Sequence, residues 1–412
     1  MRQHWTGAIL CSMALAAGLI STSGGSALAA LKPHATASLW VAPATGRTTL
    51  SAACQTAAYT DINAAISAAL PGDTVVVCPG TYTGSVTITT SSAVQPTITT
   101  GVEVNKSIDL VGLHGAVISA TGLDNGVTFY DAASAKLKGF TVAGALGEGV
   151  YAVISTRLTV EDNLVRNNDA GTQTSGYAEC RTTTDLLGSC GYGIHLVSVT
   201  QSYVLDNTVE FNKGGILLTD DYGPTHGDTV AGNLVEDNKA RSGIKLDGDS
   251  ASGVKLNGKP TPQLGGIFAN TVSNNVVISN GTAGYLSSSG TTGYGSGILL
   301  TAEVKGGASY DNLVRGNEIS GNGHSGITIY KRYAASDLSG DLISDNWIGT
   351  NDIAGSSTTG IFVGRASVTI PQVYETVIDN TIAFDHFGLY DNAGGVTRFG
   401  NHFVQVIVNY KS

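Results

Sequence analysis

Asparagine and apolar residues alternate in a fixed pattern along much of the chain. The pattern is Asn-x-(Val/Ile)-x-x-Asn, and it occurs at 163–168, 207–212, 233–238, 275–280, 317–322 and 346–351, then imperfectly at 380–385. A glycine followed by Ile or Leu comes next and opens a short apolar strand, at Gly193, Gly215, Gly243, Gly297, Gly326, Gly360 and Gly388. Self-similarity on this scale predicts an architecture of stacked coils.

The spacing of the repeats predicts where loops leave the coils. The shortest interval, Asn207 to Asn233, is close to one bare coil, so the excess in the longer intervals must be loops. Some insertions follow the Gly-Ile strand, at 220–228, 248–266, 302–310, 331–340 and 364–374. Others precede it, at 169–191, 281–296 and 352–359. Loops on both sides of one strand predict a walled groove over one sheet, suited to a long linear ligand.

The Asn side chains have a predicted structural role of their own. At equivalent corners of successive coils they can stack, each amide bonding its neighbour one coil away. Glycine and asparagine also suit the left-handed turns between strands. Earlier coils are expected at 126–129 and 149–152, and the apolar run 403–408 is expected to close the C-terminal end.

The N-terminal part predicts a cap for the stack. Asp61 can cap a helix over 61–70, in which Ile62, Ile66 and Leu70 share one face, and a buried strand follows at 73–78. A capping helix is needed because the end of a coil stack exposes strand edges and an open core. The predicted division is a signal peptide (1–29), a flexible lead-in (30–50), an N-terminal cap (51–82) and the coil domain (83–412).

The first residues are typical of an export signal. Arg2 precedes the apolar run 8–20, and a small-residue stretch ends at Ala29, which predicts cleavage nearby. The run is too short to span a membrane comfortably. With 22 basic and 32 acidic residues, the chain has a net charge of −10 and is a poor partner for nucleic acid or anionic membranes. A secreted location, extracellular or periplasmic, is expected.

Four cysteines remain after the signal peptide. Proximity in an oxidising compartment favours the pairs Cys54–Cys78 and Cys180–Cys190 among the three possible pairings. Both methionines lie within residues 1–29 and no free cysteine is expected, so the processed chain offers no soft ligand for Cu(I).

The capped N-terminus, the Asn repeats and the Gly-Ile strands resemble secreted right-handed parallel β-helix proteins of the pectin-lyase-like superfamily, over residues 55–410. The resemblance implies an all-β fold, a single-stranded right-handed parallel β-helix with an N-terminal capping helix. It also implies carbohydrate as the ligand class. It does not choose an activity, because this superfamily contains lyases, hydrolases, epimerases and non-catalytic binders.

Strand alternation assigns residues to the predicted groove. The Ile of each Gly-Ile segment and the residue two positions later point into the core, so the residues between them face outward. These outward positions are His195, Val197, Leu217, Thr219, Lys245, Asp247, Leu299, Thr301, Thr328, Tyr330, Phe362 and Tyr390.

Reactive side chains concentrate in two neighbouring coils. We predict Asp220, Asp221, His226, Lys245 and Asp247 as the catalytic group. Two carboxylates with different pKa values could hydrolyse a glycosidic bond. Alternatively, Asp221, Asp247 and Asp249 could hold Ca²⁺ against a uronate while Lys245 or Lys331 abstracts a proton. Calcium is the one cofactor considered, and tight-turn capping is the structural alternative for Asp220 and Asp221.

The predicted substrate contacts lie along the same face. They are His195, Tyr330, Lys331, Arg332 and Phe362, with the aromatic rings stacking on sugars; a solvated pair is the alternative for Lys331 and Arg332. Polygalacturonase-like hydrolases carry Asn-Thr-Asp, Asp-Asp, Gly-His-Gly and Arg-Ile-Lys. Thr219, Asp220 and Asp221 resemble part of this set, but Gly-His falls several coils late at 323–324 and Arg-Ile-Lys is absent.

These observations give two hypotheses from different classes. The first is a secreted protein that binds and cleaves an extracellular polysaccharide, as a hydrolase or lyase. The second is a non-catalytic carbohydrate-binding or cell-surface structural protein, whose polar groove residues are contacts only.

Overall fold

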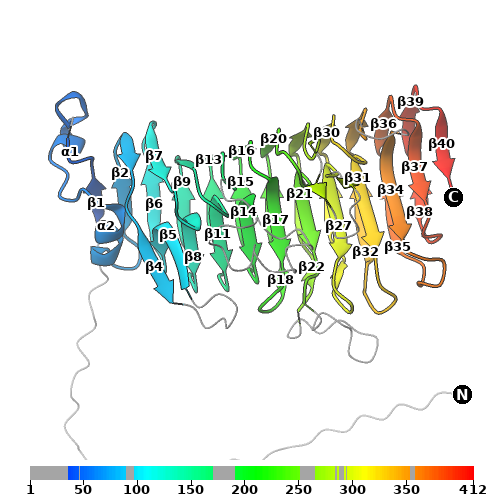
Figure 1. Ribbon diagram of the computed structural model, residues 1–412, viewed down its shortest axis with the longest axis horizontal. Coiled ribbons are helices and arrows are strands. Elements are labelled where there is room, and N and C mark those ends of the chain that lie inside the picture. The colour runs from blue at the N-terminus through cyan, green and yellow to red at the C-terminus, as the bar shows by residue number, and fades with distance from the viewer. Residues whose placement is uncertain are drawn as a thin grey trace, which may run out of the picture. The chain divides into compact units, whose positions relative to one another are not determined.

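The protein forms a stack of coils in which each full turn contributes one strand to each of three sheets (Figure 1). The computed structural model describes residues 36–45, 47–89, 97–169, 191–250, 265–283, 285–286, 292–293, 295–352 and 358–412. The expected signal peptide and the pair Cys180–Cys190 lie outside these residues. Among the residues described, no helix is long and apolar enough to cross a membrane.

Sheet A is one long parallel sheet of short strands. In order along the stack, it consists of β1 (Ser38–Val41), β2 (Thr74–Val77), β6 (Asp109–Gly112), β9 (Lys136–Lys138), β12 (Thr159–Glu161), β15 (Tyr203–Leu205), β19 (Thr229–Ala231), β23 (Thr271–Ser273), β29 (Leu313–Arg315), β32 (Ser339–Ser344), β35 (Tyr374–Ile378) and β38 (Thr397–Phe399).

Sheet B lies one corner further along each coil and is also parallel. It consists of β3 (Gly80–Tyr82), β7 (Ala116–Ser119), β10 (Thr141–Ala143), β13 (Leu164–Arg166), β16 (Thr208–Glu210), β20 (Leu234–Glu236), β24 (Val276–Ile278), β30 (Glu318–Ser320), β33 (Trp347–Gly349), β36 (Thr381–Ala383) and β39 (His402–Val404).

Sheet C contains the Gly-Ile strands and is parallel except for its first pair, β4 and β5, which is antiparallel. It consists of β4 (Val86–Thr89), β5 (Thr97–Val104), β8 (Asn125–Tyr130), β11 (Val150–Val153), β14 (Tyr192–Val197), β17 (Gly214–Thr219), β21 (Ile244–Asp247), β27 (Ile298–Ala302), β31 (Ile327–Lys331), β34 (Thr359–Arg365), β37 (Phe387–Asp391) and β40 (Val408–Lys411).

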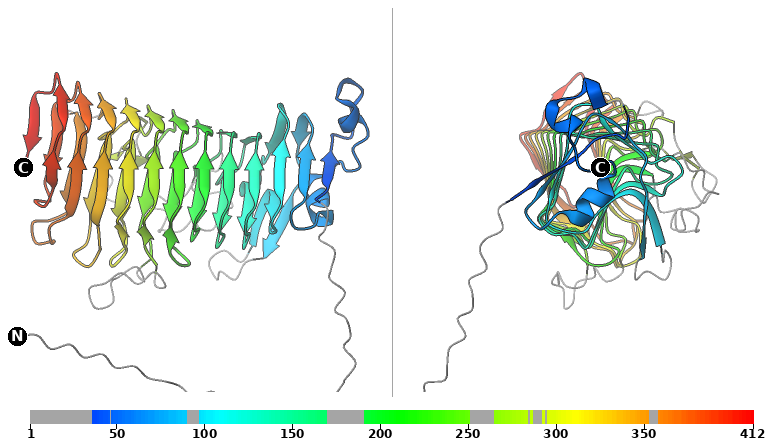
Figure 2. Two further views of the ribbon diagram at one scale, coloured as in Figure 1. Left: turned by 180° about the vertical axis from the view of Figure 1, so that it is seen from behind. Right: turned by 90° about the vertical axis from the view of Figure 1, so that its left-hand side faces the viewer.

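Two small sheets are present besides the three long ones. One is parallel and consists of β18 (Thr225–His226), β22 (Ile267–Phe268) and β28 (Ser309–Tyr310); the other is the antiparallel pair β25 (Tyr285–Leu286) and β26 (Thr292–Gly293). Seen end-on in Figure 2, successive coils superpose around one interior. That interior is filled by middle residues of three-residue strands in sheets A and B, such as Val230 and Val209, and by alternate residues of sheet C strands, such as Ile216.

The predicted Asn stacking is confirmed as two continuous ladders. In the first, each amide nitrogen donates to the amide oxygen of the next coil at 2.9–3.0 Å, through Asn163, Asn207, Asn233, Asn275, Asn317, Asn346, Asn380 and Asn401. The second runs through Asn168, Asn212, Asn238, Asn280, Asn322 and Asn351. All of these amides except Asn401, the last of the first ladder, are buried, so the hydrogen bonds satisfy groups that water cannot reach.

The ladders also explain the glycine of the Gly-Ile motif. A Cβ on Gly193 would lie 2.7 Å from Nδ2 of Asn212, so only glycine leaves room for the ladder amide. Glycine and asparagine occupy left-handed turns as expected, for example at Gly232, Gly316 and Asn274, but other residues adopt this conformation too. Several of these precede a ladder Asn, including Asp162, Asp206 and Asp345, each with φ of 54° or 55°.

A third ladder precedes sheet A and consists mainly of acids and amides. Backbone N–H groups donate in turn to the side chains of Ser202, Asp228, Asn270, Asn312, Asp341 and Glu375. Its last step places two buried carboxyl groups side by side, because Asp341 N donates to Glu375 Oε2 at 2.7 Å. The sequence repeat gave no indication of this ladder.

The N-terminal cap forms largely as expected. Helix α2 (Ile62–Ala68) begins at Asp61, whose Oδ1 accepts from Ala64 N at 2.8 Å. Ile62 and Ile66 are buried, but Leu70 is exposed because the helix ends before it. A short 3-10 helix, η1 (Arg47–Thr49), and helix α1 (Ala52–Gln55) precede α2.

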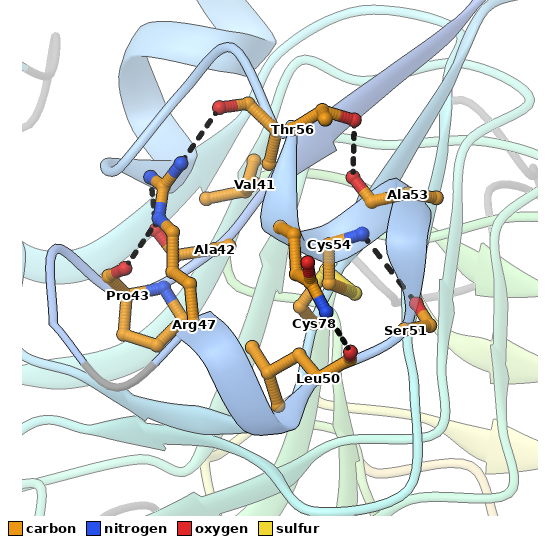
Figure 3. Close-up of a disulfide and its surroundings, with 12 residues drawn as sticks. Val41, Ala42, Pro43, Arg47, Leu50, Ser51, Ala53, Cys54, Thr56 and Cys78 are labelled. Carbon is orange, nitrogen blue, oxygen red and sulfur yellow. Dashed lines mark hydrogen bonds between the residues drawn. A yellow bond between two sulfur atoms is a disulfide. The ribbon is translucent and has the colours of Figure 1, made fainter.

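The disulfide Cys54–Cys78 is present, with a Cα–Cα distance of 5.8 Å (Figure 3). It joins α1 to the residue after β2.

Two expectations about the chain ends need correction. Residues 38–41, placed in a flexible lead-in, form β1 and pair with β2. The apolar run 403–408 does not close the stack as one strand. Gln405 has φ of 53°, so the chain turns there and divides the run between β39 in sheet B and β40 in sheet C.

Candidate functional site

The outward face of sheet C carries two rows of side chains in register. One row is His195, Leu217, Lys245, Leu299, Thr328, Phe362 and Tyr390; the other is Val197, Thr219, Asp247, Thr301 and Tyr330. The assignment from strand alternation is therefore confirmed. Strand spacing of about 4.8 Å brings reactive groups from β14, β17, β21 and β27 close together.

An ion cluster forms the centre of this face. Lys245 Nζ lies 2.6 Å from Asp247 Oδ2 and 3.2 Å from Glu303 Oε1. Asp247 is fully buried, and Glu303, just past the end of β27, keeps 20% of its side chain exposed. The backbone N–H of Glu303 also donates to Asp247 Oδ1. One cation thus joins two carboxylates from neighbouring strands.

Burial and neighbouring charges shift the pKa values of Lys245, Glu303 and the nearby Asp249. For Lys245, burial opposes the charged form, but attraction to Asp247 and Glu303 outweighs it and raises the pKa well above its usual value. For Glu303, burial raises the pKa to about 7 although Lys245 opposes the shift. Burial, and then the charges of Asp247 and Asp221, also raise the pKa of Asp249. At neutral pH the cluster therefore holds a protonated lysine, and burial gives Glu303 and Asp249 a higher pKa than an exposed carboxyl group has.

A hydrogen-bonded chain runs beside the ion cluster. The hydroxyl of Thr219 donates to Asp221 Oδ2 at 2.5 Å, so its single hydrogen is used. His195 Nε2 lies 3.1 Å from Thr219 Oγ1 and must therefore donate to that hydroxyl oxygen. Nδ1 of His195 then faces Glu148 Oε1 at 3.5 Å, and Glu148 accepts from Gly191 N. The chain ends at Asp221, which is exposed.

Asp220 has a structural role that differs from the catalytic one expected. It is fully buried, and its two oxygens accept from the backbone N–H groups of Asp249, Ser250 and Gly266. Burial raises its pKa to about 7 despite these bonds. With its oxygens committed to the backbone, Asp220 fixes the two ends of the segment 249–266.

His226 makes its contacts outside the Lys245–Asp247–Glu303 cluster. It belongs to β18, outside sheet C, and its ring stacks on Phe268 with centroids 4.8 Å apart. Phe268 stacks in turn on Tyr310 at 5.2 Å. Burial lowers the pKa of His226. This aromatic stack gives His226 a packing role.

The residues expected to contact substrate differ in how exposed their side chains are. Phe362 lies between Tyr330, with ring centroids 6.4 Å apart, and Tyr390, at 5.3 Å, so an aromatic row continues the face toward the C-terminal coils. Lys331 is buried, whereas Arg332 is exposed and lies over the Tyr333 ring. His195 faces outward but is only 5% exposed. Lys331 and Arg332 therefore do not form the solvated pair considered as an alternative.

The calcium alternative was tested against the arrangement of acids. Within the described ranges, no group of three or more His, Cys, Asp or Glu residues is placed to hold a metal ion. Asp247 instead pairs with Lys245. Asp221, Asp247 and Asp249 are thus not arranged as a calcium cage.

Comparisons with known proteins agree with this architecture. Residues 125–295 match the family model described as the right handed beta helix region. The mannuronan C-5 epimerase AlgE4 A-module of Azotobacter vinelandii is similar, with 16% identity, a TM-score of 0.51, and coverage of 86% of this chain and 94% of that one. The exopolygalacturonase of Thermotoga maritima has 10% identity and a TM-score of 0.53, covering 81% and 80%.

Two further proteins are similar over different extents. An alginate lyase from Paenibacillus sp. has 15% identity and a TM-score of 0.50, covering 92% of this chain and 99% of that one. The human SHC SH2 domain-binding protein 1 is 29% identical over 168 residues, which is 39% of this chain and 23% of that protein. The match thus spans less than a quarter of that relative.

The parallel β-helix fold predicted from the Asn repeats is confirmed. Residues 125–295 match the right handed beta helix region, and the fold of the stacked coils is similar to that of the epimerase module and the exopolygalacturonase.

Proposed function

We propose that the protein is exported and binds an extracellular polysaccharide over sheet C, where it hydrolyses a glycosidic bond. The observation that carries the proposal is the Lys245–Asp247–Glu303 cluster beside Asp221, on the outward face of one sheet. Similar folds serve an epimerase, a lyase and an exopolygalacturonase, which supports carbohydrate as the ligand class by analogy of fold.

The proton affinities favour hydrolysis over proton abstraction by lysine. Lys245 holds its proton, because two carboxylates raise its pKa, so it is a poor base. Glu303, with a pKa of about 7, can donate a proton to the leaving glycosidic oxygen. Asp221, exposed and held by Thr219, can take a proton from the water that attacks the anomeric carbon. Asp247 keeps Lys245 in place instead of acting as the acid.

Glu303 was not among the predicted catalytic residues, although it follows a Gly-Ile strand as Asp249 does. Its test is Glu303→Gln, which removes the transferable proton and keeps the shape. On the polysaccharide that the wild-type protein cleaves, turnover is expected to fall by roughly 100-fold or more. Glu318→Gln, at an exposed position in β30, is the matched control and is expected to retain activity. Full turnover by Glu303→Gln would reject the assignment.

A second candidate is favoured by the burial of this face. Lys245, Asp247 and His195 are each at most 5% exposed, which suits a structural cluster inside a non-catalytic carbohydrate-binding or surface protein. A panel of neutral and acidic polysaccharides, assayed for reducing ends and for binding, separates the two. Binding without new reducing ends supports the second candidate, and an unsaturated, ultraviolet-absorbing product indicates a lyase.

A further inference from the structure

A cleft at the N-terminal cap is separate from the face of sheet C described above. It has a volume of about 390 Å³, within the range of roughly 300–1,000 Å³ typical of small-molecule sites. Its lining comes from the chain before η1, the start of α2, β3 and the residues after it, the middle of β5, and one residue of β7. Segments far apart in sequence thus converge on one hollow.

The rim of the cleft is lined with uncommitted polar groups. It carries four exposed threonines, Thr45, Thr60, Thr81 and Thr83. In the described part of the chain, none of these four hydroxyls is in a hydrogen bond, although each can both donate and accept. Asp61 lies among them, and only its Oδ1 is used, to cap α2.

The free oxygen of Asp61 depends on a neighbouring glycine. A Cβ on Gly84 would lie 2.6 Å from Asp61 Oδ2, so the absence of a side chain there leaves room for the carboxylate. Below the rim, Ile62, Val102 and Ile118 give the cleft an apolar floor. An apolar floor under a ring of hydroxyls and one carboxylate matches the two faces of a sugar ring.

The walls are held rigidly before any ligand arrives. Arg47 donates to the backbone oxygens of Pro43, Ala42 and Ala57, which fixes the strand-to-helix connection (Figure 3). On the opposite wall, Asn63 donates to Gly101 O at 2.9 Å and accepts from the backbone N–H of β5 at 3.0 Å. Such preorganisation lowers the entropy cost of binding.

We propose that this cleft binds one neutral monosaccharide unit, with ring hydroxyls on Asp61 Oδ2 and the threonine rim and the apolar ring face on the floor. Asp61 is the one charged residue among the described residues that line the cleft, so no cation is present to neutralise a uronate. A neutral sugar supplies hydroxyl donors for the carboxylate without adding a negative charge. The site is independent of the hydrolysis proposed for sheet C.

The test uses the whole protein and saturation-transfer difference NMR. The probes are methyl glucoside, methyl galactoside and methyl mannoside at millimolar concentration, with glucuronate as the charged comparison. At least one neutral glycoside is expected to bind, and glucuronate is expected to bind roughly tenfold more weakly because Asp61 repels it. Transfer is expected to be strongest on protons of the ring face that lies on the floor.

Two variants locate the binding in the cleft. Asp61→Asn keeps a good helix cap but replaces the free acceptor, so affinity is expected to fall roughly tenfold while thermal unfolding stays unchanged. Gly84→Ala adds a methyl group against Asp61 Oδ2 and is expected to abolish binding. Thr87→Ala, at an exposed β4 position outside the cleft, is the control. Absence of binding to all three glycosides, equal binding of glucuronate, or unchanged affinity in both cleft variants would overturn the proposal. None of these outcomes tests the hydrolysis proposed for sheet C, which is tested separately by cleavage assays on sheet C variants.

Discussion

The hydroxyl of Thr219 donates to Asp221 Oδ2 at 2.5 Å. This bond determines which ring nitrogen of His195 carries a hydrogen. Because Thr219 has no second hydrogen, His195 must donate from Nε2. A buried histidine is thereby connected to an exposed carboxylate through one hydroxyl. Asp221 is held in place by a group that itself has no contact with solvent.

Replacing Thr219 by Val removes this connection while preserving the shape of the side chain. Turnover on the proposed substrate is expected to fall roughly tenfold or more, because Asp221 loses its fixed orientation. The ¹⁵N shifts of the His195 ring are expected to change as Nε2 loses its acceptor. Thr219→Ser keeps the hydroxyl and is expected to resemble wild type in both measurements. Identical ring shifts in Thr219→Val and wild type would contradict the hydrogen-bonded chain, whatever the activity.

Lys245 and Lys138 offer a comparison between buried and exposed ion pairs. Each lies within 3.2 Å of two carboxylates, but Lys138 is 41% exposed and Lys245 only 4%. Lys245→Met leaves two carboxylates without their cation, so the free energy of unfolding is expected to fall by about 3–5 kcal/mol. Lys138→Met is expected to cost much less, because solvent screens the ion pairs of this exposed lysine. Guanidinium unfolding of both variants measures the difference, and equal losses would show that burial does not govern these pairs.

The fold could be predicted because its stabilising bonds use the same residue type in each coil. A ladder amide must both donate and accept, so Asn recurs at one spacing and the sequence shows it directly. The third ladder could not be predicted, because it lacks this recurrence of one residue type. Its members are a serine, acids and amides, as at Ser202, Asp228 and Asn270, so no single residue type recurs in each coil.

The candidate site was predicted only in part. Alternation predicts the outward placement of Lys245 and Asp247, but Asp220 and Asp221 lie beyond the end of β17, where strand alternation does not apply. Asp220 is buried and Asp221 is exposed, so one holds backbone and the other is available for chemistry. The role of Glu303 depends on the direction of the chain just after β27. The sequence pattern does not predict that direction, because strand alternation ends with the strand.

Asn275 tests how much one ladder step contributes. Its Oδ1 accepts from both nitrogens of Asn233, and its Nδ2 donates to Val230 O and Asn317 Oδ1. Asn275→Ala leaves buried polar groups unsatisfied, so the free energy of unfolding is expected to fall by about 2–4 kcal/mol. Asn105→Ala, at an exposed position, is expected to change it by no more than about 0.5 kcal/mol. A comparable loss in both variants, measured by denaturant unfolding, would argue against a special contribution from the ladder.

The end of the third ladder makes stability depend on pH. Burial, and then the charge of Asp341, raise the pKa of Glu375 to about 10, and burial raises that of Asp341 to about 7. In the unfolded chain both acids titrate near pH 4. Because the folded pKa values are higher, the protonated forms favour the folded state. This contribution is complete below about pH 4 and is lost as pH rises through 7 and then toward 10.

Glu375→Gln removes one titrating group from the buried pair and places an amide at the ladder position. At pH 8 the variant is expected to be more stable than wild type by about 1–3 kcal/mol, because wild type must keep a buried acid protonated or bury its charge. At about pH 3, below the unfolded-state pKa, the advantage is expected to disappear, since Glu375 is then protonated in both states. Denaturant unfolding at both pH values measures this, with the exposed Glu318→Gln as control. A constant difference between Glu375→Gln and wild type across the two pH values would mean that the pair does not titrate on unfolding, and that the acids at this step are held by contacts other than a shared proton.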